Sequence, residues 1–235
     1  MILFRSLIFA VVFYVYSGVM AVLAVPVLLL PARYTLALFR IWSRGMLFFL
    51  NLICGVRVEI RGRQFIPQGG GLIAAKHQCM LDTMALWPTL PGAAYVSKKE
   101  LVSIPFYGWY LLKAGTLVVD RDGGAAALAK MLRDAKARVA EGRPVLIYPE
   151  GTRTPPGETI DYKPGVAGLY RDLGVACVPM ATNSGVHWPA HGFLRRPGVI
   201  VYEFLEPIPS GLKRAEFMRE LRTRIETASS ALLTH

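Results

Sequence analysis

Short apolar runs separated by longer amphipathic stretches dominate the sequence from residue 56 onward. Runs of this length predict buried or half-buried strands, and they fall at residues 56–60, 71–75, 93–96, 115–121, 144–148, 175–180 and 199–202. An apolar stripe at helical spacing predicts a helix over residues 125–139, and Phe217, Leu221 and Ile225 predict another near the C-terminus. Strands that alternate with helices are typical of an α/β fold with a mostly parallel central sheet flanked by helices.

The N-terminal part of the chain has a different pattern. Residues 6–30 contain no charged side chain. As one helix they would extend about 37 Å, more than the roughly 30 Å hydrocarbon core of a bilayer, and Pro26 is expected to kink or end that helix. A second apolar patch at residues 35–50 is interrupted by arginines, as in helices at a membrane interface. We therefore expect a membrane-anchoring helical segment over residues 1–54 and an α/β domain over residues 55–235.

Two questions about this N-terminal segment stay open at the level of sequence. Residues 22–24 resemble a cleavage site, so a secretory signal peptide is an alternative to an anchor. Arg5 precedes the first apolar run and Arg33 follows it. Basic residues on both sides therefore do not indicate which end of the run faces the cytoplasm. A single span and a kinked hairpin within one leaflet both fit.

Composition narrows the class of protein and its partners. Hydrophobic residues make up 53% and charged residues only 18%, which favours a membrane protein. The net charge of +11 favours anionic partners such as lipid headgroups or phosphates. We expect no nucleic-acid partner, because no nucleic-acid motif accompanies the basic residues of the helix at 125–139. Cys54, Cys79 and Cys177 form no C-x-x-C pair, so we expect neither a disulfide framework nor a metal site, and a reducing compartment.

The first candidate for chemistry is a His–Asp pair that follows the strand at 71–75. His77 lies where the strand ends, and Asp82 lies at the start of the next helical segment, so a turn can bring the carboxylate onto the imidazole. A carboxylate on one ring nitrogen fixes the tautomer and leaves the other nitrogen as a base. No G-x-S-x-G motif accompanies the pair, which suits a reaction in which the substrate brings the hydroxyl. Alternatively, Cys79 or Ser184 would be the nucleophile of an esterase.

The second candidate is the run Glu150, Gly151, Thr152 and Arg153, directly after the strand at 144–148. It offers a guanidinium, a hydroxyl and backbone amides exposed by glycine, which together can bind a phosphate. Glu150 is unusual in an anion site, so we expect it to brace Arg153 or a nearby backbone, or to bind a substrate hydroxyl. Because sites in parallel sheets gather at the carboxyl ends of strands, this run, His77 and the Asp120–Arg121 pair are expected to share one site.

Four segments between residues 76 and 180 together resemble the glycerolipid acyltransferase family, in particular its 1-acyl-sn-glycerol-3-phosphate acyltransferases. The segment from His77 to Asp82 resembles the first conserved block of the family. Residues 113–121 resemble the second block, 148–153 the third and 178–180 the fourth. Cys79 stands where the family frequently has Ser.

The resemblance implies transfer of an acyl chain to the 2-hydroxyl of lysophosphatidic acid. It implies His77 as the general base and Asp82 as the residue that orients it. It also implies phosphate binding by the third block, with Arg153 as the main cation and Lys113 and Arg121 as additional ones. The donor would be acyl-CoA or acyl carrier protein, with no cofactor and no metal. The protein would then lie at a membrane and face the cytoplasm, at the inner membrane of a bacterium.

Other functions remain open from sequence. Within the same reaction class, the acceptor could be a lyso-ornithine lipid, another lysophospholipid or glycerol 3-phosphate. A membrane-bound esterase would release acyl chains without an acceptor, and a basic scaffold that binds anionic lipid would need no catalytic residue. His187 lacks a paired carboxylate in the sequence and is expected to be structural. Trp188, with Arg195 and Arg196, is expected to lie at the membrane interface or to meet an acidic carrier protein.

Overall fold

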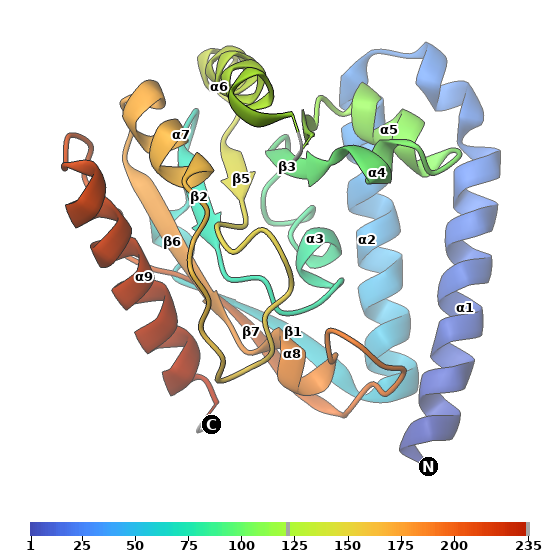
Figure 1. The fold of residues 1–235 in the computed structure, drawn as a ribbon. Coiled ribbons are helices and arrows are strands. Elements are labelled where there is room, and N and C mark those ends of the chain that lie inside the picture. Colours follow the sequence, from blue (N-terminus) through green and yellow to red (C-terminus); the bar gives the residue numbers. More distant parts are fainter. Residues whose placement is uncertain (121–122, 234–235) are drawn as a thin grey trace.

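A twisted sheet separates two layers of helices in the computed structural model, which describes residues 1–120 and 123–233 (Figure 1). Within these residues the sheet has seven strands in the order β1-β7-β6-β2-β5-β3-β4. The strands are β1 (Val56–Arg61), β2 (Leu72–Ala75), β3 (Ala94–Lys98), β4 (Leu117–Val119), β5 (Val145–Ile147), β6 (Cys177–Thr182) and β7 (Gly198–Phe204). The pairs among them are parallel except β6 with β7, which confirms the mostly parallel sheet.

The two faces of the sheet bury different helices, because successive side chains of a strand point to opposite sides. Ile73 and Ala75 of β2 belong to the core beneath α2 (Ala32–Cys54) and α3 (Asp82–Ala85). Leu72 and Ala74 belong to the core that packs against three other helices. These are α6 (Gly124–Ala140), α7 (Gly165–Leu173) and α9 (Arg214–Ala231). Because both faces of β2 are covered, its apolar residues run without alternation.

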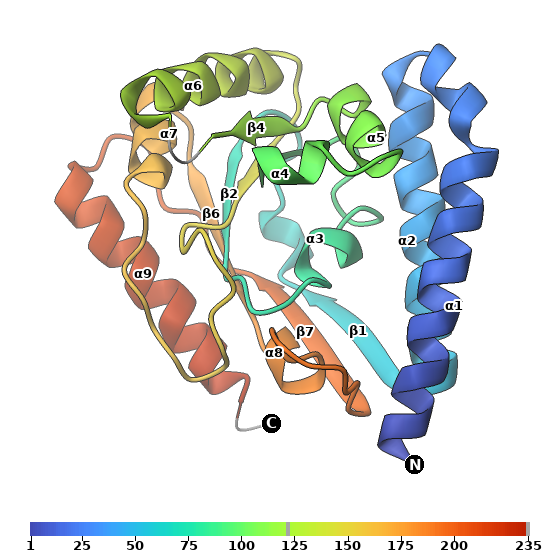
Figure 2. The same ribbon diagram turned by 45° about the vertical axis from the view of Figure 1, so that its right-hand side comes forward.

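Four shorter helical elements also belong to the α/β domain. They are η2 (Arg63–Phe65), α4 (Lys99–Val102), α5 (Tyr107–Lys113) and α8 (Ser184–His187). The segment with α4 and α5 connects β3 to the parallel strand β4, and the ribbon places α5 beside the upper end of the N-terminal helices (Figure 2).

The N-terminal segment is a helical hairpin. Its first helix, α1 (Ile2–Leu23), ends three residues before Pro26, and the short turn η1 (Val25–Leu29) leads into α2. The prediction that Pro26 ends the first helix is therefore confirmed, for the reason that proline cannot donate the backbone hydrogen bond that a helix interior needs. Within the described residues, α1 and α2 are both long and apolar enough to cross a membrane.

The two hairpin helices differ in how much of their surface the protein covers. In α2, Phe39, Met46 and Leu50 lie on one buried face toward the sheet, and Ser43 donates a hydrogen bond to the carbonyl of Met84 at 2.7 Å. In α1 only Ser6 and Phe9 are buried, so most of its apolar side chains are open to the surroundings. The hairpin therefore has one face on the α/β domain and one apolar face that no described residue covers.

The lower end of α1 is fixed to the α/β domain by polar and aromatic contacts. Phe9 packs edge-on against Trp188, and Ser6 Oγ accepts a hydrogen bond from the amide of Arg195 at 2.8 Å. The Arg195 guanidinium stacks over the indole of Trp188. Trp188 is thus buried, and the prediction that it lies at the membrane interface or meets a carrier protein is wrong. These contacts make α1 part of the folded protein.

Candidate active site

The carboxyl ends of β2 and β5 place the two predicted motifs side by side. Ala74 of β2 pairs with Ile147 of β5 in parallel register, so the residues that follow both strands emerge at the same edge of the sheet. His77 follows β2, and Glu150 follows β5. Two backbone contacts join the segments: the His77 amide donates to Glu150 Oε2 at 2.7 Å, and the Thr154 amide donates to the His77 carbonyl at 2.8 Å. Both backbone groups of His77 are therefore held by the second motif and the residue that follows it.

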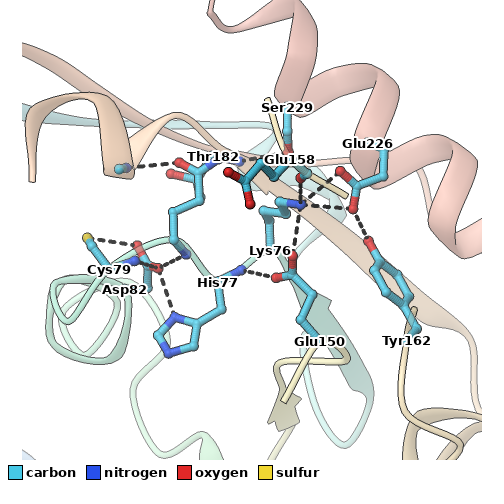
Figure 3. A network of polar contacts seen from close by, with 12 residues as sticks. Lys76, His77, Cys79, Asp82, Glu150, Glu158, Tyr162, Thr182, Glu226 and Ser229 are labelled. Atoms are coloured by element: carbon cyan, nitrogen blue, oxygen red, sulfur yellow. Dashed lines mark hydrogen bonds and ion pairs between the residues drawn. The ribbon is translucent and has the colours of Figure 1, made fainter. Parts of the chain in front are cut away.

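His77 and Asp82 form the predicted pair. The turn between them brings His77 Nδ1 to 2.9 Å from Asp82 Oδ2 (Figure 3). The same carboxylate oxygen accepts hydrogen bonds from the amides of Gln78 at 2.7 Å and Cys79 at 2.8 Å. These two amides cap the turn and fix the carboxylate against the imidazole. With Nδ1 bound to Asp82, Nε2 is the ring nitrogen left for a substrate.

The surroundings of Asp82 keep it ionised although its side chain is completely buried. Burial by itself raises the pKa of this carboxyl, but the hydrogen bond and charge of His77 and the amide of Cys79 outweigh it, so the pKa lies below its usual value. The second carboxylate oxygen accepts a hydrogen bond from the hydroxyl of Tyr202 at 2.9 Å. Tyr202 comes from β7, 120 residues later, and the sequence pattern gave no sign of this contact.

A second tyrosine holds the pair from the other side. The ring of Tyr148 stacks on the His77 imidazole, with centroids 4.3 Å apart. Its hydroxyl donates to the backbone carbonyl of Asp82 at 2.8 Å. Tyr148 thus contacts both members of the pair and limits the rotation of the imidazole.

The second predicted motif, residues 150–153, divides into buried and exposed residues. Glu150 is completely buried; besides His77 it meets Lys76, whose Nζ lies 2.8 Å from Glu150 Oε1. Gly151 has a positive φ of 69°, which glycine adopts without strain, and its amide donates to the carbonyl of Tyr148 at 3.0 Å. Both residues were predicted to bind substrate. Their contacts instead show that Glu150 braces the backbone of His77, one of the roles considered, and that Gly151 shapes the turn.

Thr152 and Arg153 are exposed at the end of this turn. The Arg153 guanidinium donates one hydrogen bond, from Nη1 to the carbonyl of Ala190 at 3.1 Å. The next residue, Thr154, donates its amide to the His77 carbonyl. Arg153 is therefore the residue directly before this contact with the His77 backbone. The backbone of Thr152 and Arg153 therefore lies close in sequence to a residue that is bonded to the His77 backbone, and the Arg153 side chain reaches Ala190.

The structure places Lys113 away from His77, against the prediction. Lys113 ends α5, four residues before β4 begins. The carbonyl of the next residue, Ala114, accepts a hydrogen bond at 2.6 Å from Arg143, which precedes β5. Lys113 therefore lies at the amino edge of the parallel strands, whereas His77 lies at the carboxyl edge. The predicted Arg121 falls outside the described residues.

Lys98 is a cation that the sequence pattern did not indicate as a site residue. It is the last residue of β3, the strand next to β5, and its side chain is exposed. Two strand spacings separate β3 from β2, which corresponds to about 10 Å across the sheet. The available signal was a basic pair, Lys98 and Lys99, directly after a predicted strand. Lys99 forms an ion pair with Asp120, whereas Lys98 points from the same edge as His77.

The alternative nucleophiles are inaccessible. The side chains of Cys79 and Ser184 are both completely buried. Burial and the nearby Asp82 carboxylate raise the pKa of the Cys79 thiol well above its usual value, so the thiol stays protonated. His187 Nδ1 lies 3.1 Å from the carbonyl of Arg196, in agreement with the expected structural role. The described residues contain no group of three or more His, Cys, Asp or Glu side chains placed to hold a metal ion.

The fold and this site define a class: an α/β protein with a braced His–Asp pair and an exposed arginine at the carboxyl edge of its sheet. A family model described as acyltransferase matches residues 57–183, more than half of the chain. A 1-acyl-sn-glycerol-3-phosphate acyltransferase of Pseudomonas aeruginosa is 32% identical over 183 residues, which cover 78% of this chain and 71% of that protein. The chain belongs to the acyltransferase family.

More distant proteins agree with this assignment. The human 1-acyl-sn-glycerol-3-phosphate acyltransferase alpha is 30% identical over 169 residues, which cover 70% of this chain and 58% of that protein. A crystal structure of the 1-acyl-sn-glycerophosphate (LPA) acyltransferase from Thermotoga maritima superposes with a TM-score of 0.82 at 20% identity. That comparison covers 100% of this chain and 99% of the other, so the same fold extends through the N-terminal hairpin.

Proposed function

We propose that this protein transfers a fatty acyl chain from an acyl thioester to the 2-hydroxyl of 1-acyl-glycerol-3-phosphate, which gives phosphatidic acid. The observation that carries the proposal is the His77–Asp82 pair, 2.9 Å apart, beside two side-chain nucleophiles that are both completely buried. A base without an accessible nucleophile of its own suits an attacking hydroxyl that comes from the substrate, and release of thiol without acceptor would show attack by water instead. The names of the similar proteins from Pseudomonas aeruginosa and human support this acceptor.

The chemistry follows from the geometry of the pair. His77 Nδ1–H donates to Asp82, so Nε2 carries the lone pair and takes the proton of the acceptor hydroxyl. The hydroxyl oxygen attacks the thioester carbonyl and forms a tetrahedral intermediate. When the carbon–sulfur bond breaks, the imidazolium returns its proton to the leaving thiolate. The Asp82 carboxylate stabilises the imidazolium between these two steps. The thioester is already activated, so the proposal requires neither a metal nor a cofactor; coenzyme A and acyl carrier protein are both suitable carriers.

The acceptor phosphate is proposed to bind at the turn after β5. Arg153 is exposed beside the His77 backbone, and its guanidinium can make a bidentate contact with phosphate oxygens. Thr152 adds a hydroxyl, and Lys98 adds a positive charge from β3. Arg121 stays in the proposal as a predicted additional cation. With the phosphate at Arg153, the glycerol backbone extends toward His77.

The apolar surface that the protein leaves uncovered is proposed to lie in a membrane, with the α/β domain facing the cytoplasm. This surface includes α1 and the turn η1, where Leu29 is largely exposed. It continues onto α5, because Trp109 and Leu112 are about half exposed and the Tyr110 hydroxyl donates to the carbonyl of Ala21 at 2.7 Å. Tryptophan is enriched at membrane interfaces. The net charge of +11 favours an anionic lipid surface, such as the bacterial inner membrane presents.

The experiment that tests the function measures thiol release from an acyl-CoA by the purified protein. Wild type and His77→Ala are each assayed with and without 1-acyl-glycerol-3-phosphate, and the acyl-carrier-protein thioester is run in parallel as donor. Release that needs the acceptor and disappears in His77→Ala is the expected result. Release without acceptor would support an esterase instead. Release only with a lyso-ornithine lipid, another lysophospholipid or glycerol 3-phosphate would contradict the proposed acceptor and keep the reaction class.

A further inference from the structure

A buried lysine lies directly behind His77. Lys76 is the residue after β2, its side chain is 1% exposed, and it points away from the imidazole toward α9 (Figure 3). Its ammonium lies 2.8 Å from Glu150 Oε1 and 2.8 Å from Glu226 Oε2. A third contact goes to the backbone carbonyl of Glu158 at 3.1 Å. All the donors of the ammonium are therefore used inside the protein, and none is left for a substrate.

This lysine links the C-terminal helix to the backbone of the catalytic histidine. Glu226, on α9, holds the Lys76 ammonium, which in turn holds one oxygen of Glu150. The other oxygen of Glu150 accepts the hydrogen bond from the His77 amide at 2.7 Å. Tyr162 fixes the far end of the chain of contacts, because its hydroxyl donates to Glu226 at 2.8 Å. Any displacement of Glu226 is thereby passed to the peptide group that carries the imidazole.

The charges explain why the connection from α9 to His77 needs both Glu150 and Glu226 as partners of Lys76. Burial raises the pKa of Glu150, and the positive charge of Lys76 acts against this effect and favours the ionised carboxylate. An ionised Glu150 can pair with the ammonium through one oxygen and accept a strong hydrogen bond from the His77 amide at the other. Glu226 balances and orients the ammonium, because a buried charge is stable only when it is paired and hydrogen-bonded.

Apolar side chains dock α9 on the sheet. Phe217, Leu221 and Ile225 of this helix are completely buried in the core and hold it there by apolar burial. Glu226 lies outside residues 57–183, the part matched by the family model, and 150 residues after Lys76. Its ion pair thus joins the C-terminal helix to a residue of the matched region.

We propose that Lys76 and Glu226 are positioning residues, which hold the His77 backbone in its reactive place through Glu150. The proposal rests on the proposed function, in which His77 is the base. Because a misplacement of about 1 Å at a reacting group costs roughly a hundredfold in rate, a small shift of this peptide is enough to be measured. The effect belongs to kcat rather than to substrate binding, because neither residue faces the acceptor or the donor.

The test compares Glu226→Ala and Glu226→Gln with Glu220→Ala, a matched change on the same helix whose side chain pairs with Arg224 at the surface. In Glu226→Ala, kcat is expected to fall about tenfold or more while KM for both substrates changes less than twofold. Glu226→Gln keeps the shape and the acceptor for Tyr162, so it is expected to fold and to show a smaller loss. Glu220→Ala is expected to keep wild-type kcat.

A second readout does not depend on the substrate. The imidazole resonances of His77, measured by NMR after ¹⁵N-histidine labelling, are expected to move in both Glu226 variants and to stay in place in Glu220→Ala. If the Glu226 variants lose thermal stability but keep wild-type kcat and an unmoved His77 spectrum, Glu226 is only structural and the proposal is overturned. If wild type transfers no acyl chain while the spectra still move, the proposed function fails and the positioning role stands.

Discussion

Asp82→Asn separates the charge of Asp82 from its role as an acceptor of hydrogen bonds. The two backbone amides of Gln78 and Cys79 both donate to Oδ2. An asparagine side chain must therefore turn its oxygen to this position, because its NH₂ group would face two donors. The oxygen remains an acceptor for His77 Nδ1–H, so the tautomer is retained. The Tyr202 hydroxyl can reverse its hydrogen bond and accept from the new amide.

The size of the effect follows from the lost charge. Opposite unit charges about 4 Å apart attract by about 4 kcal/mol at an effective dielectric constant of 20. The dipole of the amide retains part of this attraction, so the imidazolium in the reaction loses about 2–4 kcal/mol. At about 1.4 kcal/mol per factor of ten, kcat is expected to fall roughly 30- to 1000-fold.

The assay is thiol release at saturating acceptor and donor, with His77→Ala as the reference for complete loss of the base. Asp82→Asn is expected to keep a measurable rate above that reference, because its histidine is correctly oriented. A rate within threefold of wild type would refute the electrostatic role of Asp82. A rate as low as that of His77→Ala would refute the argument that the two amides preserve the tautomer.

Three further predictions follow from the site and the surface. Arg153→Ala is expected to raise KM for 1-acyl-glycerol-3-phosphate about tenfold with little change in KM for the donor, because a charge-assisted phosphate contact is lost; an unchanged acceptor KM would remove Arg153 from the phosphate site. The lowered pKa of Asp82 implies stability that is present above the unfolded pKa of about 3.9 and is lost as pH falls through the folded value. The gap in melting temperature between wild type and Asp82→Asn should therefore shrink as pH falls below about 3.9, and a constant gap would contradict the shift. The double change of Trp109 and Leu112 to Ser is expected to weaken co-sedimentation with anionic vesicles; Leu233→Ser on the opposite side is the control, and equal binding by both variants would show that α5 does not contact lipid.

Local pattern predicted much of the fold because strands and helices are encoded by residues close in sequence. The apolar runs located the strands, and Pro26 located the end of the first helix. Asp82 was identified correctly as the partner of His77, because one tight turn joins the two residues. Thr152 and Arg153 follow a buried strand and are exposed, as the sequence pattern suggested, and their role in binding substrate stays a prediction.

The prediction that Lys113 lies near His77 is wrong for a geometric reason. A residue before a parallel strand lies at the amino edge of the sheet, and a residue after it lies at the carboxyl edge. Lys113 precedes β4, whereas Lys98 ends β3, so only Lys98 shares the edge with His77. The resemblance to the second family block suggested Lys113 as a site residue. The direction of β4 then decided at which edge of the sheet Lys113 lies.

The sequence by itself determined the class of fold, the apolar character of the N-terminal segment and the His–Asp pair, since each depends on the order of near neighbours. Only the tertiary structure decided what surrounds the pair. Tyr202 contacts Asp82 from 120 residues later in the chain, and Glu226 contacts Lys76 from 150 residues later. Glu150 turned inward to Lys76 instead of outward to a substrate, because a buried ammonium must be paired. Contacts over such separations depend on how strands are ordered in the sheet, and that order is fixed by packing of the whole chain.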